Sequence, residues 1–240
     1  MQSTFLLRAV VRNLPETVEK LFRRTLSPGH TRGLKLVRGE FARRVAAGAT
    51  TVFVHTPRCA GTSMRKAVPD ALTHSHFSAG DYRLLLGRER FARCFTFGFV
   101  RNPWDRLVSS FFHLKRGGDH ANDKAWADRH LARYDHFDEF VTEWLTPANV
   151  FSDVWHFVPM TRFVCLPGHA RPALDFLGRY ETLAEDFAAV AARLGLGATL
   201  ERVNAAPRDR SNYRDYYTPK TRRIVERVYQ SDVRAFEYEF

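Results

Sequence analysis

Residues 50–64, with the sequence TTVFVHTPRCAGTSM, carry the signals of a buried strand, a tight loop and the start of a helix. The first part is an uncharged run of β-branched and aromatic residues, which predicts a buried strand of a parallel sheet at residues 51–54. Pro57 cannot donate to a sheet ladder, and Gly61 can adopt backbone angles that other residues avoid, so the strand should end in a loop. A helix is then expected over residues 64–72.

This strand-loop-helix arrangement is a ready-made anion site, because backbone N–H groups and the positive end of a helix dipole point at one spot. Arg58 adds a full positive charge at the tip of the loop. The spacing is not that of a Walker A motif, since the cation precedes the glycine, and an ordinary strand-to-helix turn is the alternative interpretation. The residues predicted to hold the anion are Pro57, Arg58, Cys59, Ala60, Gly61, Thr62 and Ser63.

A second stretch repeats the pattern. Residues 94–100, CFTFGFV, form another candidate buried strand, and Arg101 follows it directly. Asn102 can cap a helix that should run to about residue 115. Arg101 would then lie at the end of a strand and Ser109 on the second turn of a helix, where a guanidinium and a hydroxyl can bind one phosphate.

Together these two stretches resemble known motifs. HTPRCAGTS looks like the 5′-phosphosulfate loop of the carbohydrate sulfotransferases of sulfotransferase family 2, and FVRNPWDRLVSSFF looks like their 3′-phosphate motif. The chain is similar to the heparan and dermatan 2-O-sulfotransferases and to the chondroitin sulfotransferases. The resemblance runs from Thr51 to the C-terminus, and it also covers HSHFSAGDYRLLL, GRYETLAEDFAAV and the last segment, YRDYYTPKTRRIVERVYQSDVRAFEYEF.

The resemblance implies a fold, a donor and a reaction. The fold would be a P-loop-like three-layer α/β domain with a central parallel sheet flanked by helices. The donor would be 3′-phosphoadenosine 5′-phosphosulfate (PAPS), and the acceptor a hydroxyl, expected on a carbohydrate. Arg101 and Ser109 would hold the 3′-phosphate. Two further arginines, Arg208 and Arg210, lie in a basic loop that the resemblance places beside the nucleotide.

The loop departs from the family pattern at its cation. The family has a lysine where this chain has Arg58, and Cys59-Ala60-Gly61 replaces the family's T-G-G. Arginine keeps the charge that would stabilise the leaving phosphate, but it is planar and bulkier than lysine. The expected role of Arg58 is therefore both donor binding and catalysis.

The general base is expected in the HSH sequence at residues 74–76. In the related 2-O-sulfotransferases an H-x-H pair between the two phosphate motifs provides the base, and histidine has a suitable unperturbed pKa. The resemblance implies that His76 is the base and His74 a supporting residue. The alternative is a solvent-exposed histidine pair on a loop.

Further elements follow from periodicity and turn signals. Strands are expected at residues 162–165 and 176–180, and helices at 79–86, 137–145, 183–194 and 218–231. Glu181, in the GRYE turn, is expected to be a structural acid. The cation-rich segment 113–133 fits either a groove for an anionic sugar chain or a solvated surface.

The net charge indicates the kind of partner, and the composition along the chain indicates the domain organisation. A net charge of +11 favours acidic partners. Residues 1–48 are predicted to be a basic helical arm and residues 49–240 the sulfotransferase domain. The arm fits either a packing helix or peripheral contact with a membrane. No window reaches the roughly 18 apolar residues of a membrane span, and a cytoplasmic location is expected.

The three cysteines, Cys59, Cys94 and Cys165, lack metal-ligand spacing. Cys59 could act as a nucleophile if the helix dipole and Arg58 lowered its pKa, whereas a core thiol is the simpler interpretation. We identify no His/Asp/Glu cluster with ligand spacing, so no metal is expected to take part in the reaction.

Two other functions fit parts of the sequence. A P-loop kinase would use a similar first loop, but it should also show a glycine-lysine pair and an acidic magnesium ligand, and neither is found. A nucleic-acid-binding module would explain the basic character, but its arginines should form one stripe. Because the informative arginines lie at strand ends, no nucleic-acid partner is expected. The sequence does not predict an oligomeric state.

Overall fold

A parallel sheet organises the computed structural model, which describes residues 40–74, 76–151, 154–197, 200 and 212–240. In this part of the chain the sheet has three strands in the order β1-β2-β3, all parallel. The strands are β1 (Thr51–Val54), β2 (Phe95–Val100) and β3 (Phe176–Arg179). Phe53 pairs with Phe97, and Phe97 pairs with Phe176. The prediction of an α/β fold with a central parallel sheet is confirmed.

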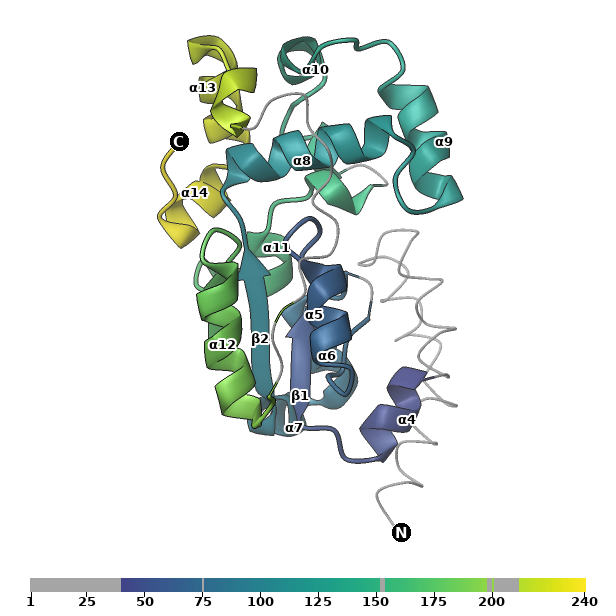
Figure 1. Cartoon of the computed structure of the whole chain (residues 1–240), viewed down its shortest axis with the longest axis vertical. Coiled ribbons are helices and arrows are strands. Elements are labelled where there is room, and N and C mark those ends of the chain that lie inside the picture. The colour runs from purple at the N-terminus through teal and green to yellow at the C-terminus, as the bar shows by residue number, and fades with distance from the viewer. Residues whose placement is uncertain (1–39, 75, 152–153, 198–199, 201–211) are drawn as a thin grey trace.

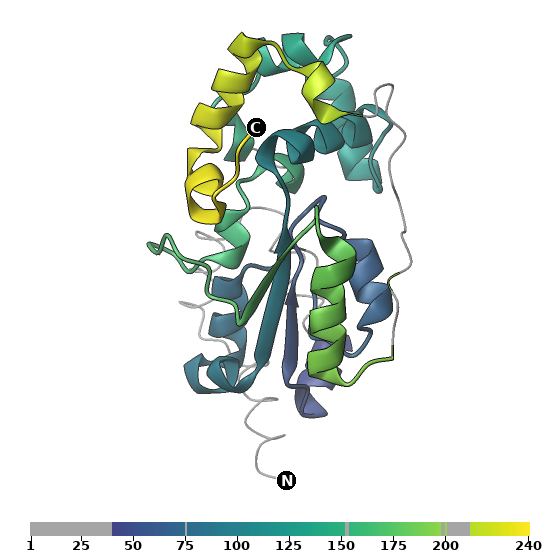
Figure 2. The same ribbon diagram turned by 60° about the vertical axis from the view of Figure 1, so that its left-hand side comes forward.

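The uncharged strand sequences explain why the sheet is buried. The side chains of Val52, Phe53 and Val54 are almost completely inaccessible, and so are those of Phe97 and Phe99 on the central strand. Strands buried on both faces are typical of parallel sheets covered by helices. Helices α6 and α12 cover opposite sides of the strands (Figures 1 and 2).

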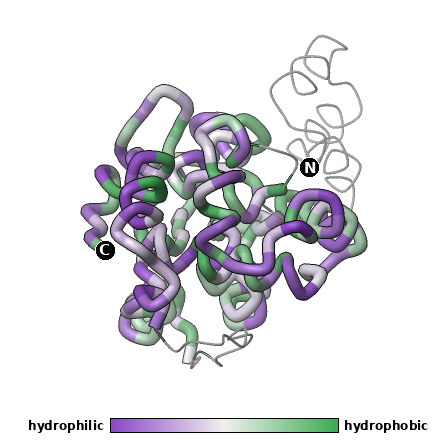
Figure 3. The backbone as a smooth tube through the Cα atoms, turned by 90° about the horizontal axis from the view of Figure 1, so that it is seen from above, coloured by the Kyte–Doolittle hydropathy of each residue, from purple (hydrophilic) through white to green (hydrophobic). Residues whose placement is uncertain are grey.

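Helices make up most of the remaining described chain. In the view from above, hydrophobic and hydrophilic segments alternate along many of them (Figure 3), as expected of amphipathic helices packed on one core. Before β2 they are α4 (Glu40–Ala46), α5 (Gly61–Ala67), α6 (Ala79–Leu86) and α7 (Arg88–Arg93). After β2 they are α8 (Pro103–Lys115), α9 (Ala121–His130), α10 (Phe137–Glu143), η1 (Asn149–Phe151), η2 (Trp155–Phe157), α11 (Thr161–Val164), α12 (Leu183–Leu194), η3 (Tyr213–Tyr216), α13 (Pro219–Val228) and α14 (Gln230–Phe236).

A second group of helices lies beyond the end of the sheet to which the strands point. Helix α8 crosses this end, and α9, α10 and α13 gather around it (Figure 1). Aromatic side chains fill the space between these helices, with Phe140 stacked on Trp144 at 5.1 Å and both rings against Phe157. The carboxyl ends of parallel strands are where α/β proteins bind ligands. The sheet and the helical group therefore enclose the expected binding region.

The helix after the first loop begins and ends earlier than predicted. It starts at Gly61, because this residue fits directly beneath the ring of His55, where a Cβ atom would lie 1.7 Å from Nε2. It ends at Ala67, because Val68 precedes Pro69 and a residue before proline avoids the helical conformation. Leu72 instead lies beside β1, and its N–H donates to the carbonyl of Thr51.

The predicted strand at residues 162–165 is wrong, because most of it belongs to helix α11. The fully buried carboxylate of Asp232 accepts hydrogen bonds from the N–H groups of Met160 at 2.7 Å and Thr161 at 2.9 Å. It therefore satisfies N–H groups that the first turn of a helix leaves without partners. This cap comes from α14, so the local sequence did not reveal it.

The predicted C-terminal helix is two helices. Tyr229 adopts non-helical backbone angles between α13 and α14. Its ring is buried, and its hydroxyl donates to the carbonyl of Phe157 at 2.7 Å. The break therefore coincides with a residue held in the core. The other predicted helices at residues 79–86, 103–115, 137–145 and 183–194, and the strand at 176–180, are confirmed to within two residues at each end.

Helix α4 is the described part of the predicted N-terminal arm, since residues 1–39 lie outside the described residues. Phe41 and Val45 of α4 are buried in the core, and the Phe41 ring packs on Phe77 and Tyr82. Arg44 donates to the carbonyl of Ala71 at 2.9 Å. Among the described helices, none is both long and apolar enough to cross a membrane.

Candidate functional site

The loop between β1 and α5 has an unusual backbone. Arg58 and Ala60 both lie in the left-handed region, with φ angles of 66° and 62°. Such angles cost a non-glycine residue about 1 kcal/mol or more, so surrounding contacts must hold them. Arg106, which is only 2% exposed, donates from Nε to the carbonyl of Pro57 at 3.0 Å and from Nη2 to that of Val158 at 2.9 Å. This buried guanidinium fixes the backbone at Pro57, the first residue of the predicted anion-binding stretch 57–63.

The start of α5 is where the sequence predicts an anion to bind. The residue before the helix, Ala60, has no side-chain cap, so no side chain of that residue neutralises the positive end of the helix. Thr62 is half-buried and Ser63 buried on the first turn. The predicted loop residues 57–63 therefore form one continuous turn around the helix start.

Cys59 lies inside this loop, but its environment is that of a core thiol. The residue is 1% exposed, and Sγ contacts the Sδ atom of Met160 at 3.8 Å. Burial raises the pKa of the Cys59 thiol to about 12. The thiolate needed for nucleophilic catalysis is therefore disfavoured, and we assign Cys59 to the core.

Arg101 lies at the end of β2, as predicted, and is fixed by several partners. Nε donates to Asp105 at 2.7 Å, and the guanidinium carbon lies 3.9 Å from the centre of the Tyr180 ring. Asn102 caps α8 by accepting from the N–H groups of Trp104 and Asp105. Arg101 itself is 4% exposed, so these contacts hold its guanidinium in one orientation beside the loop.

Glu181 fixes the junction between β2 and α8. One carboxylate oxygen accepts from the N–H of Asn102 at 2.6 Å, and the other accepts from the hydroxyl of Tyr238 at 2.8 Å. These contacts agree with the expected structural role. They also connect the end of β3 and the C-terminal segment to the strand end that carries Arg101.

The structure brings together three of the predicted site residues. Nε of Arg58 donates to the Oγ of Ser109 at 3.2 Å, and Nη1 of Arg101 donates to the carbonyl of Arg58 at 3.1 Å. Burial, and next the charge of Arg101, lower the pKa of Arg58 to about 10, so the side chain keeps its charge at neutral pH. Two guanidinium groups beside a hydroxyl are a suitable set of hydrogen-bond donors for an anion with several oxygens.

One detail differs from the expected division of roles. The resemblance assigns Arg58 to the 5′-phosphosulfate and Ser109 to the 3′-phosphate, whereas the structure pairs the two side chains with each other. The contact would have to open if the two side chains bind different groups of one donor. Arg208 and Arg210 lie outside the described residues.

The two predicted histidines have different surroundings. His74 stacks on Phe77 at 4.2 Å, and its backbone N–H donates to the hydroxyl of Tyr82. His76 has a φ of 60°, and its ring lies 5.0 Å from that of His55, which begins the anion loop. Of the two, His76 therefore faces the loop.

Two further residues of the site, His55 and Arg106, were missed by the sequence reasoning. Burial, and next the charge of His76, lower the pKa of His55 well below its usual value. His55 directly follows β1, and Arg106 lies inside the second motif, so their positions carried a signal. Their contacts with Gly61 and Pro57 depend on the folded loop, which the sequence alone did not supply.

An open groove with a volume of about 1230 Å³ begins at His76. Leu84 and Phe151, each 58% exposed, and Trp155 give it apolar surface. Besides His76 and His169, it is lined by five arginines, Arg83, Arg88, Arg162, Arg171 and Arg234, and by two acidic residues, Asp81 and Glu237. None of the described residues of segment 113–133 lines this groove. The groove therefore does not support the interpretation of that segment as a binding surface for an anionic sugar chain.

Residues 51–239 match the model of the sulfotransferase family, a span that includes both anion motifs and the histidine pair. An uncharacterized protein of Archaeoglobus fulgidus is 31% identical over 131 residues, which cover 54% of this chain and 90% of that protein. No solved structure matches the chain. The family match covers far more than half of the sequence, and the chain therefore belongs to the sulfotransferase family.

Proposed function

We propose that this protein transfers a sulfuryl group from PAPS to a hydroxyl of a saccharide. The observation that carries the proposal is the meeting of Arg58, Arg101 and Ser109, from three elements, at the carboxyl end of the sheet. Family membership supports sulfuryl transfer in general and favours it over the kinase and nucleic-acid alternatives. The donor and the acceptor class are our inference.

In the proposed donor complex, the loop amides with Thr62 and Ser63 bind the 5′-phosphosulfate. Arg101 and Ser109 bind the 3′-phosphate, with further charge supplied by Arg208 and Arg210. Such sites bind tightly because guanidinium groups donate charge-assisted hydrogen bonds to phosphate oxygens. We propose that the Arg58–Ser109 contact opens when the donor enters, which releases Arg58 to the sulfate side.

The reaction itself requires positioning and charge stabilisation. The acceptor oxygen attacks sulfur in line as the bond between sulfur and the bridging oxygen breaks, by analogy with phosphoryl transfer. Arg58 stabilises the charge that develops on the leaving phosphate. His76 accepts the proton of the acceptor hydroxyl. Because His76 lines the groove and also lies against His55, it can meet an acceptor in the groove and the donor loop.

The groove favours an acidic saccharide. Its five arginines outnumber its two acidic residues, so it attracts carboxylate or sulfate groups on the acceptor. Trp155 and Phe151 add surface on which the apolar faces of sugar rings can pack. A neutral alcohol or a tyrosine peptide would make little use of this lining.

Transfer from PAPS labelled at sulfur tests the proposal directly. We expect label in an acidic polysaccharide, much less in a neutral polysaccharide, and none in a tyrosine peptide. The same reaction with Arg101→Ala is the control for enzyme-dependent transfer. Label that enters only the peptide would overturn the acceptor assignment, and no transfer to any hydroxyl compound would overturn the function.

A further inference from the structure

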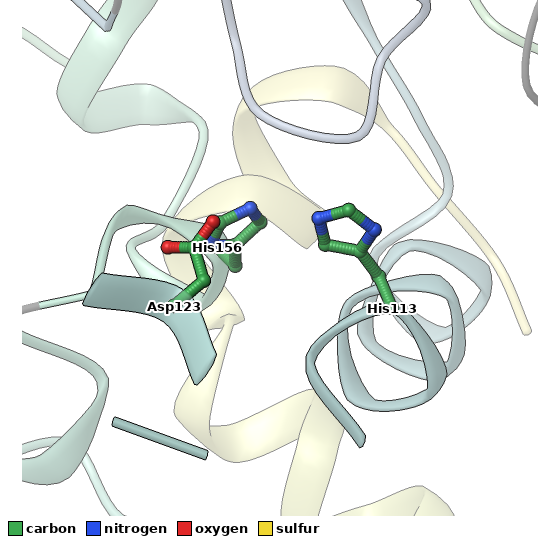
Figure 4. Close-up of side chains that lie close together, drawn as sticks. All are labelled: His113, Asp123 and His156. Carbon is green, nitrogen blue, oxygen red and sulfur yellow. The ribbon is translucent and has the colours of Figure 1, made fainter. Parts of the chain in front are cut away.

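Three side chains near the anion loop form a cluster that the proposed reaction does not use. His113 comes from α8, Asp123 from α9 and His156 from η2, and Figure 4 shows them gathered around one point. One ligand atom of each lies within 4.8 Å of the others. They come from three separate elements, and their spacing in the sequence matches no metal-binding motif, which is why ligand spacing did not predict them.

The two imidazoles are buried without the hydrogen bonds they require. His113 and His156 are each 9% exposed. Nε2 of His113 and Nδ1 of His156 have no hydrogen-bond partner among the described residues. An unsatisfied buried nitrogen is costly, and two in one cluster call for a common explanation. A cation that accepts a lone pair from each would provide it.

The surrounding chain holds the cluster in place. Oγ of Ser110 donates to the backbone carbonyl of His156 at 2.9 Å. The N–H of Asp119 donates to the carboxylate of Asp123 at 3.2 Å. Gly118 has a φ of 64°, and a Cβ atom there would lie 2.3 Å from the Cβ of Asp123. Only glycine allows this turn to bring Asp123 of α9 so close to the end of α8.

The charges around the cluster suit a divalent cation. His113 and His156 each supply one imidazole ring, and the neutral form of an imidazole offers a nitrogen lone pair to a metal ion. The carboxylate of Asp119 lies 3.7 Å from Nε2 of His113 and adds to the charge of Asp123. The charges of Arg58 and Arg116 also act on His113 and oppose a cation, whereas the carboxylates of Asp119 and Asp123 favour one.

The donor set selects the metal. Two imidazole nitrogens and one carboxylate oxygen are ligands of zinc, whereas calcium and magnesium are bound by oxygen. Tetrahedral ligands bonded at about 2.0–2.1 Å lie ~3.4 Å apart, so ligand atoms within 4.8 Å of one another need to close by up to about 1.4 Å. Three protein ligands leave the fourth position for water or another ligand.

We propose that His113, Asp123 and His156 form a zinc site. It lies one helical turn along α8 from Ser109, so the metal would connect α8, α9 and η2 beside the anion loop. The site does not depend on the proposed sulfuryl transfer. It predicts a metal-bound form of the protein that is more resistant to heat than the metal-free form.

Zinc binding to tag-free protein, stripped with a chelator and dialysed, tests the site. We expect one zinc ion per chain by elemental analysis, and in calorimetry a sub-micromolar Kd, within an order of magnitude. Bound zinc should raise Tm by about 5 °C. Cobalt(II) in its place should give the visible spectrum of tetrahedral coordination.

Two variants test whether zinc binds at this cluster or at other histidines of the chain. Asp123→Asn keeps an oxygen that can accept from Asp119, and it should weaken zinc binding at least about tenfold by removing the charged ligand. His120→Ala removes an exposed histidine from the same segment and should change nothing. The circular dichroism spectrum of Asp123→Asn and its affinity for adenosine 3′,5′-bisphosphate report whether the fold is intact.

Two outcomes would overturn the proposal. One is the absence of stoichiometric zinc in the wild-type protein, which would mean that water joins the three side chains. The other is equal zinc affinity in Asp123→Asn and wild type, which would place the metal elsewhere. Neither outcome affects the donor site, whose own test is binding of the bisphosphate.

Discussion

Arginines lie in two different settings in this molecule. At the end of the sheet, Arg101 and Arg106 are almost fully buried, and each is fixed by hydrogen bonds. In the groove, Arg162 and Arg171 are exposed. Buried guanidinium groups in fixed positions recognise a ligand of one shape. Exposed ones attract acidic groups of any shape, and salt screens that attraction. The end of the sheet therefore suits a donor of one fixed structure, and the groove suits an extended acceptor.

The largest effect is expected at His76, the residue shared by the two regions. His76→Ala should lower kcat by about 10²–10³ and leave the affinity for adenosine 3′,5′-bisphosphate unchanged, because a general base acts only in the chemical step. Steady-state kinetics and calorimetry measure the two quantities. His74→Ala is the matched variant, and it should retain most activity. If His74→Ala shows the larger loss of kcat, the base is the other histidine.

Arg101→Ala tests the buried setting. Loss of charge-assisted hydrogen bonds to a phosphate should weaken bisphosphate binding roughly a hundredfold. Arg179→Ala is a close control, because Arg179 also ends a strand and lies over a tyrosine ring, but it donates to the carbonyl of Phe236 and not to a loop carbonyl. Equal weakening by both variants would show that the effect is one of general stability.

Arg162→Ala combined with Arg171→Ala tests the exposed setting. The KM for an acidic acceptor should rise about two- to thirtyfold at low salt, because each of the two exposed pairs contributes ~0.2–1 kcal/mol. The difference should shrink at high salt, while bisphosphate affinity stays unchanged. Arg129→Ala with Arg227→Ala removes the same charge outside the groove. A comparable rise in KM in this control variant would show that the acceptor responds to the net charge of the protein and not to the groove.

The smallest effect is expected at Cys59. With its pKa raised to about 12 by burial, Cys59 is a neutral thiol at pH 7. Cys59→Ser should keep kcat within about twofold, and the native protein should not react with iodoacetamide at this residue. A folded Cys59→Ser protein without turnover would revive the covalent mechanism.

Local signals in the sequence predicted much of the fold. The uncharged strands, the Asn102 cap and the turn at Gly61 each act within a few residues, and the structure contains all of them. The turn at residues 57–63 was predictable for the same reason, because its glycine and its proline are part of one short motif.

Contacts between distant segments were not predictable in this way. Asp232 caps α11 from the C-terminal helix and converts a strand-like sequence into a helix. Arg58 and Ser109 were each identified, but their contact depends on how α8 crosses the end of the sheet. The cluster of His113, Asp123 and His156 likewise requires the folded turn at Gly118.

The most direct test of the donor site is calorimetric titration of the protein with adenosine 3′,5′-bisphosphate, with ATP as the comparison, in magnesium-free buffer. The site formed by Arg58, Arg101, Ser109 and the loop should bind the bisphosphate at least ~10² times more tightly than ATP, a difference of about 2.7 kcal/mol. Equal or tighter binding of ATP would contradict the account and favour the kinase alternative.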